Sequence, residues 1–336
     1  MKVFNSRVDK KTILVLTLVI IIGFGVGILI GINLPNSDNS VRTSNSFPDF
    51  ITKNENYFTI SIGAIPEIDS SSYRLNVWGE INNPGNFTLS ELQSLDLIEK
   101  TLTTECIGNP TKGPLLSTAV WGGFLIYDFL ESLGLKANAT GIKYKAADGY
   151  YVSNTLDQLR DNGTLGALYM NGEILPPAQG FPLRIVNPGS FGAKQPAWVI
   201  EMEVIDRPLE DFWDDRGWDT TPPMDVDSTI FFPNEIVHAS VGTPLEIGGA
   251  AFGGTRISKV EVTIDGGATW SQANIVESID ADHVWVFWKA YITFNFSDNL
   301  LLYSKATDVY NNTQPMNDLN WVDGSNSWPS LLIKVD

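Results

Sequence analysis

A run of 23 residues without a charged side chain, residues 12–34, limits what the N-terminal part of this chain can fold into. A helix of that length is long enough to cross the roughly 30 Å hydrocarbon core of a bilayer. Four basic residues precede the run, at positions 2, 7, 10 and 11, and such residues favour the cytoplasmic side. The sequence therefore predicts a cytoplasmic basic tail over 1–11 and a single-pass transmembrane helix over 12–34 in the cell membrane. The bulk of the chain is then extracytoplasmic.

A cleaved signal peptide is the alternative interpretation of the same run. The run is long for a signal peptide, and no small-residue cleavage motif follows it. An uncleaved anchor is therefore favoured. Residues 35–56 are rich in Asn and Ser and predict a polar tether between the anchor and the rest of the chain.

The net charge of the chain after residue 11 limits the classes of partner that it can bind. The whole protein has 22 Lys and Arg against 39 Asp and Glu. The first 11 residues contain four basic residues and one acidic residue, which leaves 18 against 38, a net charge of −20. A surface this acidic repels phosphate backbones, so no nucleic-acid partner is expected.

Two domains are predicted from the pattern of apolar residues. A strand-like stretch at 73–81 and a helix-like stretch at 124–135 indicate an α+β domain over 57–222. After residue 226 the pattern is that of strands only. Alternating residues at 259–273 surround an Asp-Gly-Gly turn signal at 265–267, and 284–294 is a further strand. These features predict an immunoglobulin-like β-sandwich over 226–336.

Cys106 is the only cysteine, so the chain forms no internal disulfide. A buried structural thiol and an intermolecular disulfide are two possible roles. A nucleophilic thiolate needs a base, and the two histidines, His238 and His283, lie more than 130 residues downstream. A fourth possibility is a single thiolate that binds a soft metal whose other ligands come from a cofactor.

Several short motifs occur in a fixed order around and after Cys106. The first domain contains Cys-Ile-Gly-Asn at 106–109, Trp-Gly-Gly-Phe at 121–124, Asp-Gly-Tyr at 148–150, Met-Asn-Gly at 170–172, Gln-Gly-Phe-Pro-Leu-Arg at 179–184, and a Pro188, Gly192, Lys194 series. The second domain contains Val-Glu-Val-Thr-Ile-Asp-Gly-Gly at 260–267 and Asn-Thr-Gln-Pro at 312–315. In order and spacing, over about 57–336, these motifs resemble the sulfite oxidase family of molybdopterin-dependent oxidoreductases.

The resemblance implies a molybdenum cofactor, Mo-molybdopterin, with Cys106 as the protein ligand of the metal. It implies that Cys106 and Tyr150 are catalytic, and that the cofactor contacts Gly108, Asn109, Asp148, Gln179, Arg184 and Lys194. Glycine-rich loops allow backbone amides close to a ligand, and an arginine can pair bidentately with a phosphate. The structural alternatives are a strand-end salt bridge for Arg184 and a plain β-turn for Asp148 and Tyr150.

The match departs from the family pattern in ways that bear on the reaction. Ile60 stands where sulfite-oxidising members have an arginine, and Gln179 replaces a histidine beside the pterin. No arginine follows Arg256, although Lys112 could supply a replacement cation. With fewer cations for a dianion, the implied oxygen-atom transfer favours a less charged S- or N-oxide over sulfite.

The resemblance also implies partners. Electrons would pass to or from a separate carrier, since the chain has no haem or iron–sulfur motif. The β-sandwich would form a homodimer. The N-terminal region lacks the Arg-Arg pair of a twin-arginine export signal. This absence leaves an alternative interpretation of the function open. In that alternative the chain is a cofactor-free envelope module that retains the fold for binding or assembly.

Overall fold

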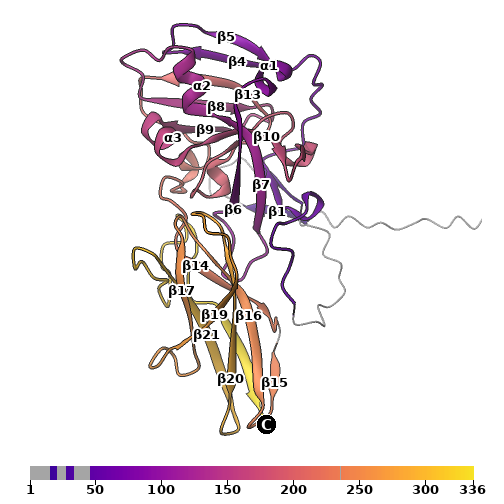
Figure 1. Cartoon of the computed structure of the whole chain (residues 1–336), viewed down its shortest axis with the longest axis vertical. Coiled ribbons are helices and arrows are strands. Elements are labelled where there is room, and N and C mark those ends of the chain that lie inside the picture. The colour runs from indigo at the N-terminus through magenta and orange to yellow at the C-terminus, as the bar shows by residue number, and fades with distance from the viewer. Residues whose placement is uncertain (1–15, 21–27, 34–45, 235) are drawn as a thin grey trace, which may run out of the picture.

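The computed structural model describes residues 16–20, 28–33, 46–234 and 236–336, which form two domains stacked along the long axis (Figure 1). The elements up to the end of the first domain are β1 (Leu16–Ile20), β2 (Ile28–Asn33), η1 (Asn54–Asn56), β3 (Thr59–Ser61), β4 (Arg74–Gly79), β5 (Gly85–Thr88), α1 (Leu89–Gln93), β6 (Leu97–Glu105), β7 (Leu116–Leu125), α2 (Ile126–Ser132), β8 (Gly141–Ala146), β9 (Tyr151–Thr155), α3 (Leu156–Asn162), β10 (Leu165–Met170), β11 (Glu173–Ile174), η2 (Pro177–Gln179), β12 (Arg184–Val186), η3 (Gly192–Lys194), β13 (Val199–Ile205) and η4 (Asp214–Arg216). Those of the second domain are β14 (Asp227–Phe232), β15 (Val237–Ala239), β16 (Pro244–Phe252), β17 (Ile257–Thr263), β18 (Ser271–Gln272), β19 (Asn274–Glu277), β20 (Val286–Thr293), β21 (Asp298–Asp308) and β22 (Ser330–Val335).

Two sheets build the first domain. One has the strand order β11-β10-β7-β6, with β12 also paired to β10, and the other has the order β5-β4-β13-β8-β9. The three α-helices have only five or seven residues each. The domain is therefore mostly β. The sequence-based expectation of an α+β domain overestimated its helix content.

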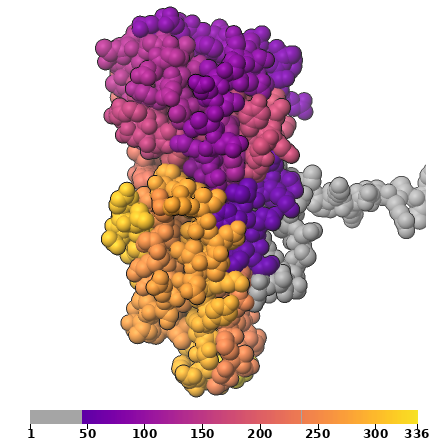
Figure 2. Space-filling view, in the orientation of Figure 1, coloured from indigo at the N-terminus to yellow at the C-terminus, as the bar shows by residue number. Residues whose placement is uncertain are grey.

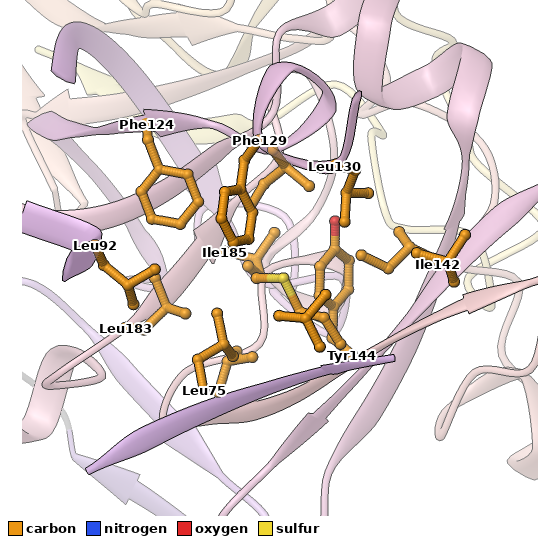
Figure 3. Packing of buried hydrophobic residues seen from close by; sticks show 14 of the residues in the cluster. Leu75, Leu92, Phe124, Phe129, Leu130, Ile142, Tyr144, Leu183 and Ile185 are labelled. Carbon is orange, nitrogen blue, oxygen red and sulfur yellow. The ribbon is translucent and has the colours of Figure 1, made fainter. Parts of the chain in front are cut away.

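The core of the first domain joins both sheets to the short helices (Figure 3). Figure 3 shows Phe129 and Leu130 of α2 between Phe124 of β7 and Ile142 of β8, with Leu75 of β4 in the same cluster. All five side chains are buried at 5% exposure or less, which makes this cluster the main source of hydrophobic stabilisation in the domain.

The helix predicted over 124–135 is shorter in the structure. α2 begins at Ile126, because the preceding residues continue β7. Gly123 in this strand lies so close to β10 that an added Cβ would be 2.2 Å from the carbonyl oxygen of Gly166. The glycine thus permits close strand pairing at this position.

The predicted all-β second domain is confirmed. Its two sheets have the orders β14-β16-β20-β19 and β15-β22-β21-β17-β18, and Trp288, Val260 and Leu302 are among the fully buried residues between them. The predicted hairpin at 259–273 is present as the β17–β18 pair. Gly266 and Gly267 adopt φ values of 69° and 93° in its turn, a conformation that glycine adopts without strain.

The transmembrane helix predicted over 12–34 is not confirmed. Within that range the structure describes β1 and β2, which pair antiparallel, and β2 also pairs with β3. Among the described residues no helix is both long and apolar enough to cross a membrane. The rest of 12–34 and the predicted basic tail over 1–11 lie outside the described residues.

The described part of the predicted tether, residues 46–56, packs against the sandwich. The Phe47 ring stacks on the Phe287 ring with centroids 4.8 Å apart, and the Trp285 indole donates a hydrogen bond of 3.0 Å to the Phe50 carbonyl oxygen. Figure 2 shows the indigo N-terminal residues lying against the orange second domain. These residues are thus part of the folded body.

Hydrogen bonds between the domains fix the end of β6. The Thr103 amide donates to the carbonyl oxygen of His283 at 2.8 Å. The Trp285 amide in turn donates to the Thr103 hydroxyl at 2.8 Å. Because Cys106 follows β6 directly, the sandwich holds the strand that positions the thiol.

Candidate active site

A pocket in the first domain brings together five of the residues singled out from the sequence. Its lining includes Cys106 and Gly108 after β6, Asp148 and Tyr150 between β8 and β9, and Arg184 on β12. These segments are far apart in the sequence, and the sheets place them around one space. The pocket is the candidate active site.

Cys106 lies in a tight turn at the end of β6. Its amide donates to the Leu115 carbonyl oxygen at 3.1 Å, and its own carbonyl oxygen accepts from the Asn109 amide at 2.8 Å. Burial raises the pKa of the Cys106 thiol to about 11, and a hydrogen bond from the Gly108 backbone offsets part of that shift. A thiol of this kind is protonated at neutral pH unless a bound metal stabilises the thiolate.

Neither histidine lines the pocket. His238 is exposed on β15, and the His283 carbonyl group contacts β6 from the side of the sandwich. Since a nucleophilic cysteine needs a base within hydrogen-bond reach, the arrangement does not favour covalent catalysis by Cys106. The geometry is compatible with the buried-thiol and metal-ligand interpretations.

Asn109 supports the Cys106 loop from outside the pocket lining. Its side chain donates to Glu105 Oε1 at 3.0 Å and accepts from the Leu115 amide at 3.0 Å. The side chain is buried at 5% exposure. Asn109 therefore holds the loop that carries the thiol rather than facing the pocket itself.

Arg184 is a buried cation without an ionic partner. Its Nη1 donates a long hydrogen bond of 3.3 Å to the Gln179 carbonyl oxygen, and its Nε has no partner. Its guanidinium lies 5.3 Å from the centre of the Trp121 ring. No carboxylate among the described residues lies within salt-bridge distance of it, so the strand-end salt bridge considered above is absent. Burial lowers the pKa of Arg184.

Gln179 offers a second unsatisfied group close to Arg184. It belongs to η2, and its side-chain amide donates to the Tyr57 carbonyl oxygen and to the Thr59 hydroxyl, both at 3.0 Å. Its Oε1 is buried and has no hydrogen-bond partner. An unpaired buried acceptor costs free energy unless a ligand or a water donates to it.

Lys194 does not offer a free cation to the pocket. Its ammonium lies 2.9 Å from the Asp211 carboxylate and donates to the Ser153 carbonyl oxygen at 3.0 Å. Both side chains of the ion pair are buried, at 3% and 5% exposure. The structure thus differs from the sequence interpretation of Lys194 as a phosphate ligand, because a carboxylate already neutralises it.

Asp148 and Tyr150 form a turn at the pocket wall. The Tyr150 amide donates to Asp148 Oδ1 at 3.0 Å, and the Tyr150 hydroxyl donates to the Ala193 carbonyl oxygen at 2.6 Å. Burial raises the pKa of both side chains. Tyr150 therefore stays a neutral phenol, and the turn brings its hydroxyl to the pocket as well as closing the loop.

The remaining wall of the pocket is apolar and partly aromatic. Ile60 lines it from β3, and Trp213 and Trp218 line it from the segment before the sandwich. Sequence reasoning missed both tryptophans; the signal was the aromatic-rich stretch Phe-Trp-Asp-Asp-Arg-Gly-Trp at 212–218. Lys112 does not replace the missing arginine, since its ammonium donates to the Ser330 carbonyl oxygen in the sandwich at 2.9 Å.

These residues fit a molybdopterin cofactor. A soft thiol, an unpaired buried guanidinium and an unpaired buried acceptor all lie in or beside one pocket. A metal, an anionic phosphate and a pterin donor would satisfy them in that order. Asn109 and Lys194 fit as supports of the walls around this space.

Comparison with known proteins agrees with this donor set. Residues 62–213 match the family "Oxidoreductase molybdopterin binding domain", and residues 219–335 match the "Mo-co oxidoreductase dimerisation domain". The chain is 30% identical to sulfite oxidase of Gallus gallus, covering 79% of this chain and 68% of the relative. It is 27% identical to sulfite oxidase of Arabidopsis thaliana, covering 80% and 83%.

More distant similarities extend across the family. A nitrate reductase of Ulva prolifera is 27% identical over 81% of this chain, which spans only 39% of that longer relative. Among solved structures, the sulfane dehydrogenase SoxCD from Paracoccus pantotrophus superposes with a TM-score of 0.77 at 21% identity, covering 98% of this chain and 93% of that one. That likeness shows a shared fold. The chain belongs to the sulfite oxidase family of molybdopterin-dependent oxidoreductases.

Proposed function

We propose that this protein binds a molybdenum cofactor through Cys106 and transfers an oxygen atom to or from a small, weakly charged S- or N-oxide. The observation that carries the proposal is the unpaired guanidinium of Arg184 in the same pocket as the Cys106 thiol. A buried cation without a carboxylate is costly in an empty protein and becomes favourable when an anionic ligand pairs with it. The chain is strongly acidic overall, so an anionic ligand would be attracted mainly to this one local cation.

Four of the predicted residues would hold or support the cofactor in this proposal. When bound, the cofactor supplies the metal centre for oxygen transfer and the storage of two electrons. Cys106, as a thiolate, would hold the metal, and Arg184 would hold the cofactor's phosphate. Gln179 does not line the pocket itself but lies next to the lining residue Ala178, and its unpaired Oε1 would accept a hydrogen bond from the pterin. Asp148 orders the turn that carries Tyr150 by accepting from its amide.

Tyr150 is the proton-bearing group at the substrate side. Its pKa is raised by burial and by nearby acidic groups, so the phenol keeps its proton at physiological pH. The hydroxyl now donates to the Ala193 carbonyl oxygen and can turn to an oxygen atom of the substrate. It thus orients the substrate by a hydrogen bond without adding charge.

The pocket electrostatics support a weakly charged substrate. Arg184 is the only cationic side chain among the described lining residues, and the cofactor would occupy it. Ile60 offers no charge where a second guanidinium would contact a dianion. At an effective dielectric of about 20, a missing contact between unit charges at about 4 Å removes on the order of 4 kcal/mol before solvent compensation.

The assembly follows from the two domains. The second domain matches a dimerisation domain, which indicates a homodimer.

The chain has one cysteine and hence no Cys-x-x-Cys-His haem motif, so we propose that its electrons are exchanged with a separate carrier.

The test is the metal content of the full-length protein, produced in a host that makes the cofactor. Molybdenum near one equivalent per chain is expected for the wild type, with thiolate-to-metal absorption bands. Cys106→Ser should lose the bands and the turnover while its circular dichroism spectrum shows an unchanged fold, because a hard oxygen replaces a soft sulfur. A wild-type protein without molybdenum would instead support a cofactor-free module, and unchanged bands in the variant would remove Cys106 as the ligand.

A further inference from the structure

Two tryptophan rings connect the pocket with the protein surface. Trp218 lines the pocket and packs beside the Cys106 loop, where a Cβ added to Gly108 would lie 3.5 Å from its ring. The Trp321 ring lies perpendicular to Trp218 with centroids 5.3 Å apart. Trp321 is 65% exposed. Two touching aromatic side chains thus bridge the distance from the loop of the candidate metal ligand to solvent.

Trp321 belongs to a connection rich in exposed apolar side chains. This connection joins β21 to β22. Its exposed large apolar residues are Val309, Tyr310, Met316, Leu319 and Trp321. Leu319 is the most exposed of them, at 93%. Aromatic and apolar side chains gathered on one exposed segment are typical of a protein-binding surface.

The connection is fixed against the first domain at the rim of the pocket. The Asp219 amide donates to the Val322 carbonyl oxygen at 3.0 Å, and Thr111 and Ser325 share a hydrogen bond of 3.3 Å. Gly324 packs so closely on the Phe191 ring that an added Cβ would lie 2.5 Å away. Trp321 therefore keeps a defined position relative to the pocket.

The charge around Trp321 is negative. No Lys, Arg or His occurs between residues 306 and 333, whereas Asp318 and Asp323 lie on either side of Trp321 in the sequence. Burial raises the pKa of Asp225, and the charges of Asp323 and Asp318 raise it further. Asp225 therefore lies close to both carboxylates. Two copies of such a surface would repel each other, and a positively charged partner would be attracted to it.

We propose that the surface around Trp321 docks a positively charged one-electron carrier protein, and that Trp218 and Trp321 lie on the electron path between this carrier and the pocket. The inference rests on the proposed oxygen-atom transfer. Written for reduction, the substrate oxide takes up two electrons and two protons and gives the reduced product and water. Two carrier molecules each lose one electron per turnover, and in the reverse direction each gains one.

The experiment compares a protein carrier with a small dye on the full-length, molybdenum-loaded protein. Lysine-rich cytochrome c serves as the carrier probe, with affinity measured by calorimetry at low and high salt. Trp321→Ala should weaken cytochrome binding at least tenfold and slow electron exchange with cytochrome to a similar extent. Turnover with a viologen dye should stay within twofold of wild type, because Trp321 does not line the pocket.

Trp78→Ala is the matched control, since Trp78 is 41% exposed on β4 and outside the pocket lining. It should leave both readouts unchanged. The proposal is overturned if wild type does not bind cytochrome at low salt, or if Trp321→Ala binds it normally. Equal loss of dye turnover would make Trp321 a support of the pocket, and a change in oligomeric mass would make the surface a contact between copies.

The two proposals fail separately. A wild-type protein without molybdenum contradicts the proposed function and with it the electron path. The calorimetric comparison needs no metal and still decides whether this surface binds a basic carrier.

Discussion

Two buried cations near the pocket have opposite surroundings, and this difference sets their roles. Lys194 is paired with Asp211, whereas Arg184 has no carboxylate among the described residues. The free energy of burying a charge is recovered only by a partner. Lys194 is therefore a structural residue, and Arg184 is the cation that can pair with an anionic ligand.

Replacing Arg184 should separate stability from cofactor binding. Arg184→Met removes an unpaired buried charge and keeps an apolar stem, so the free energy of unfolding of the cofactor-free protein should rise by roughly 1 kcal/mol. The molybdenum content after expression should fall. Denaturant unfolding and elemental analysis measure the two effects. A strong loss of stability with full metal content would assign Arg184 to the fold alone.

Lys194→Met should have the reverse effect. It leaves the Asp211 carboxylate buried without its cation, and loss of one partner of a buried ion pair costs about 3–5 kcal/mol. Adding Asp211→Asn to this variant should restore part of the loss, because the unpaired charge is then gone. Normal stability of the single variant together with lost molybdenum would show that Lys194 contacts the cofactor after all.

Ile60→Arg tests the substrate proposal at one position. The new guanidinium enters the pocket wall from β3 and should lower the KM for sulfite at least tenfold, since it supplies the missing contact with a dianion. Ile60→Met is the control for side-chain length. Steady-state rates with sulfite and with a neutral sulfoxide give the comparison. Efficient sulfite oxidation by the wild type would contradict the preference for weakly charged substrates.

At the scale of single elements, local patterns in the sequence predicted local structure well. The Asp-Gly-Gly signal at 265–267 identified the β17–β18 hairpin, because a turn depends on residues adjacent in the chain. The apolar spacing over 124–135 predicts a helix throughout, although Phe124 belongs to β7 and pairs with Gly166 of β10. The apolar spacing there does not distinguish a strand end from a helix start, and the pairing with β10 decides it.

The role of a site residue depended on contacts that no local pattern contains. The motif around Lys194 predicts a cation that contacts the cofactor, but its ion-pair partner Asp211 lies 17 positions later, between β13 and η4. Trp213 and Trp218 lie in an irregular segment without periodicity, so the aromatic-rich stretch at 212–218 does not by itself indicate that they line the pocket. By contrast, Cys106, Tyr150 and Arg184 each lie in a short local motif, and all three line the pocket in the structure.

The hairpin turn also gives a pH-dependent prediction. The Asp265 carboxylate accepts hydrogen bonds from the hydroxyls of Thr263 and Thr269 and from the Thr269 amide, and these lower the pKa of Asp265. A lowered folded-state pKa contributes stability above the unfolded value of about 3.9 that is lost as the pH falls. Asp265→Asn should therefore destabilise the protein at pH 7 and progressively less below about pH 4. Unfolding titrations at pH 7 and pH 3 give the comparison, and an equal difference at both would contradict the assignment.

At the scale of the whole molecule, the two domains form one body through β6 and the N-terminal segment. Thr103 of β6 bonds to the backbone of His283 and Trp285, while Phe47 and Phe50 cover aromatic residues of the sandwich. The same strand ends at the Cys106 loop. Stability of the sandwich is thus coupled to the geometry of the pocket, and the two domains should unfold together.

Phe47→Ala tests this coupling. Phe47 stacks on Phe287 and meets Phe232 edge-on at 5.0 Å, but it is only half-buried. Its loss should cost roughly 2 kcal/mol, about half of the value for a fully buried phenylalanine. Since Trp285 ties this region to β6, the cost should lower the midpoint of a single thermal transition by several degrees. Phe296→Ala, at a 53% exposed position, is the control and should leave the midpoint unchanged. Circular dichroism and tryptophan fluorescence should give the same midpoint in each variant. Two separate transitions, with only the sandwich shifted by Phe47→Ala, would show that the domains unfold independently and that β6 does not transmit the change to the Cys106 loop.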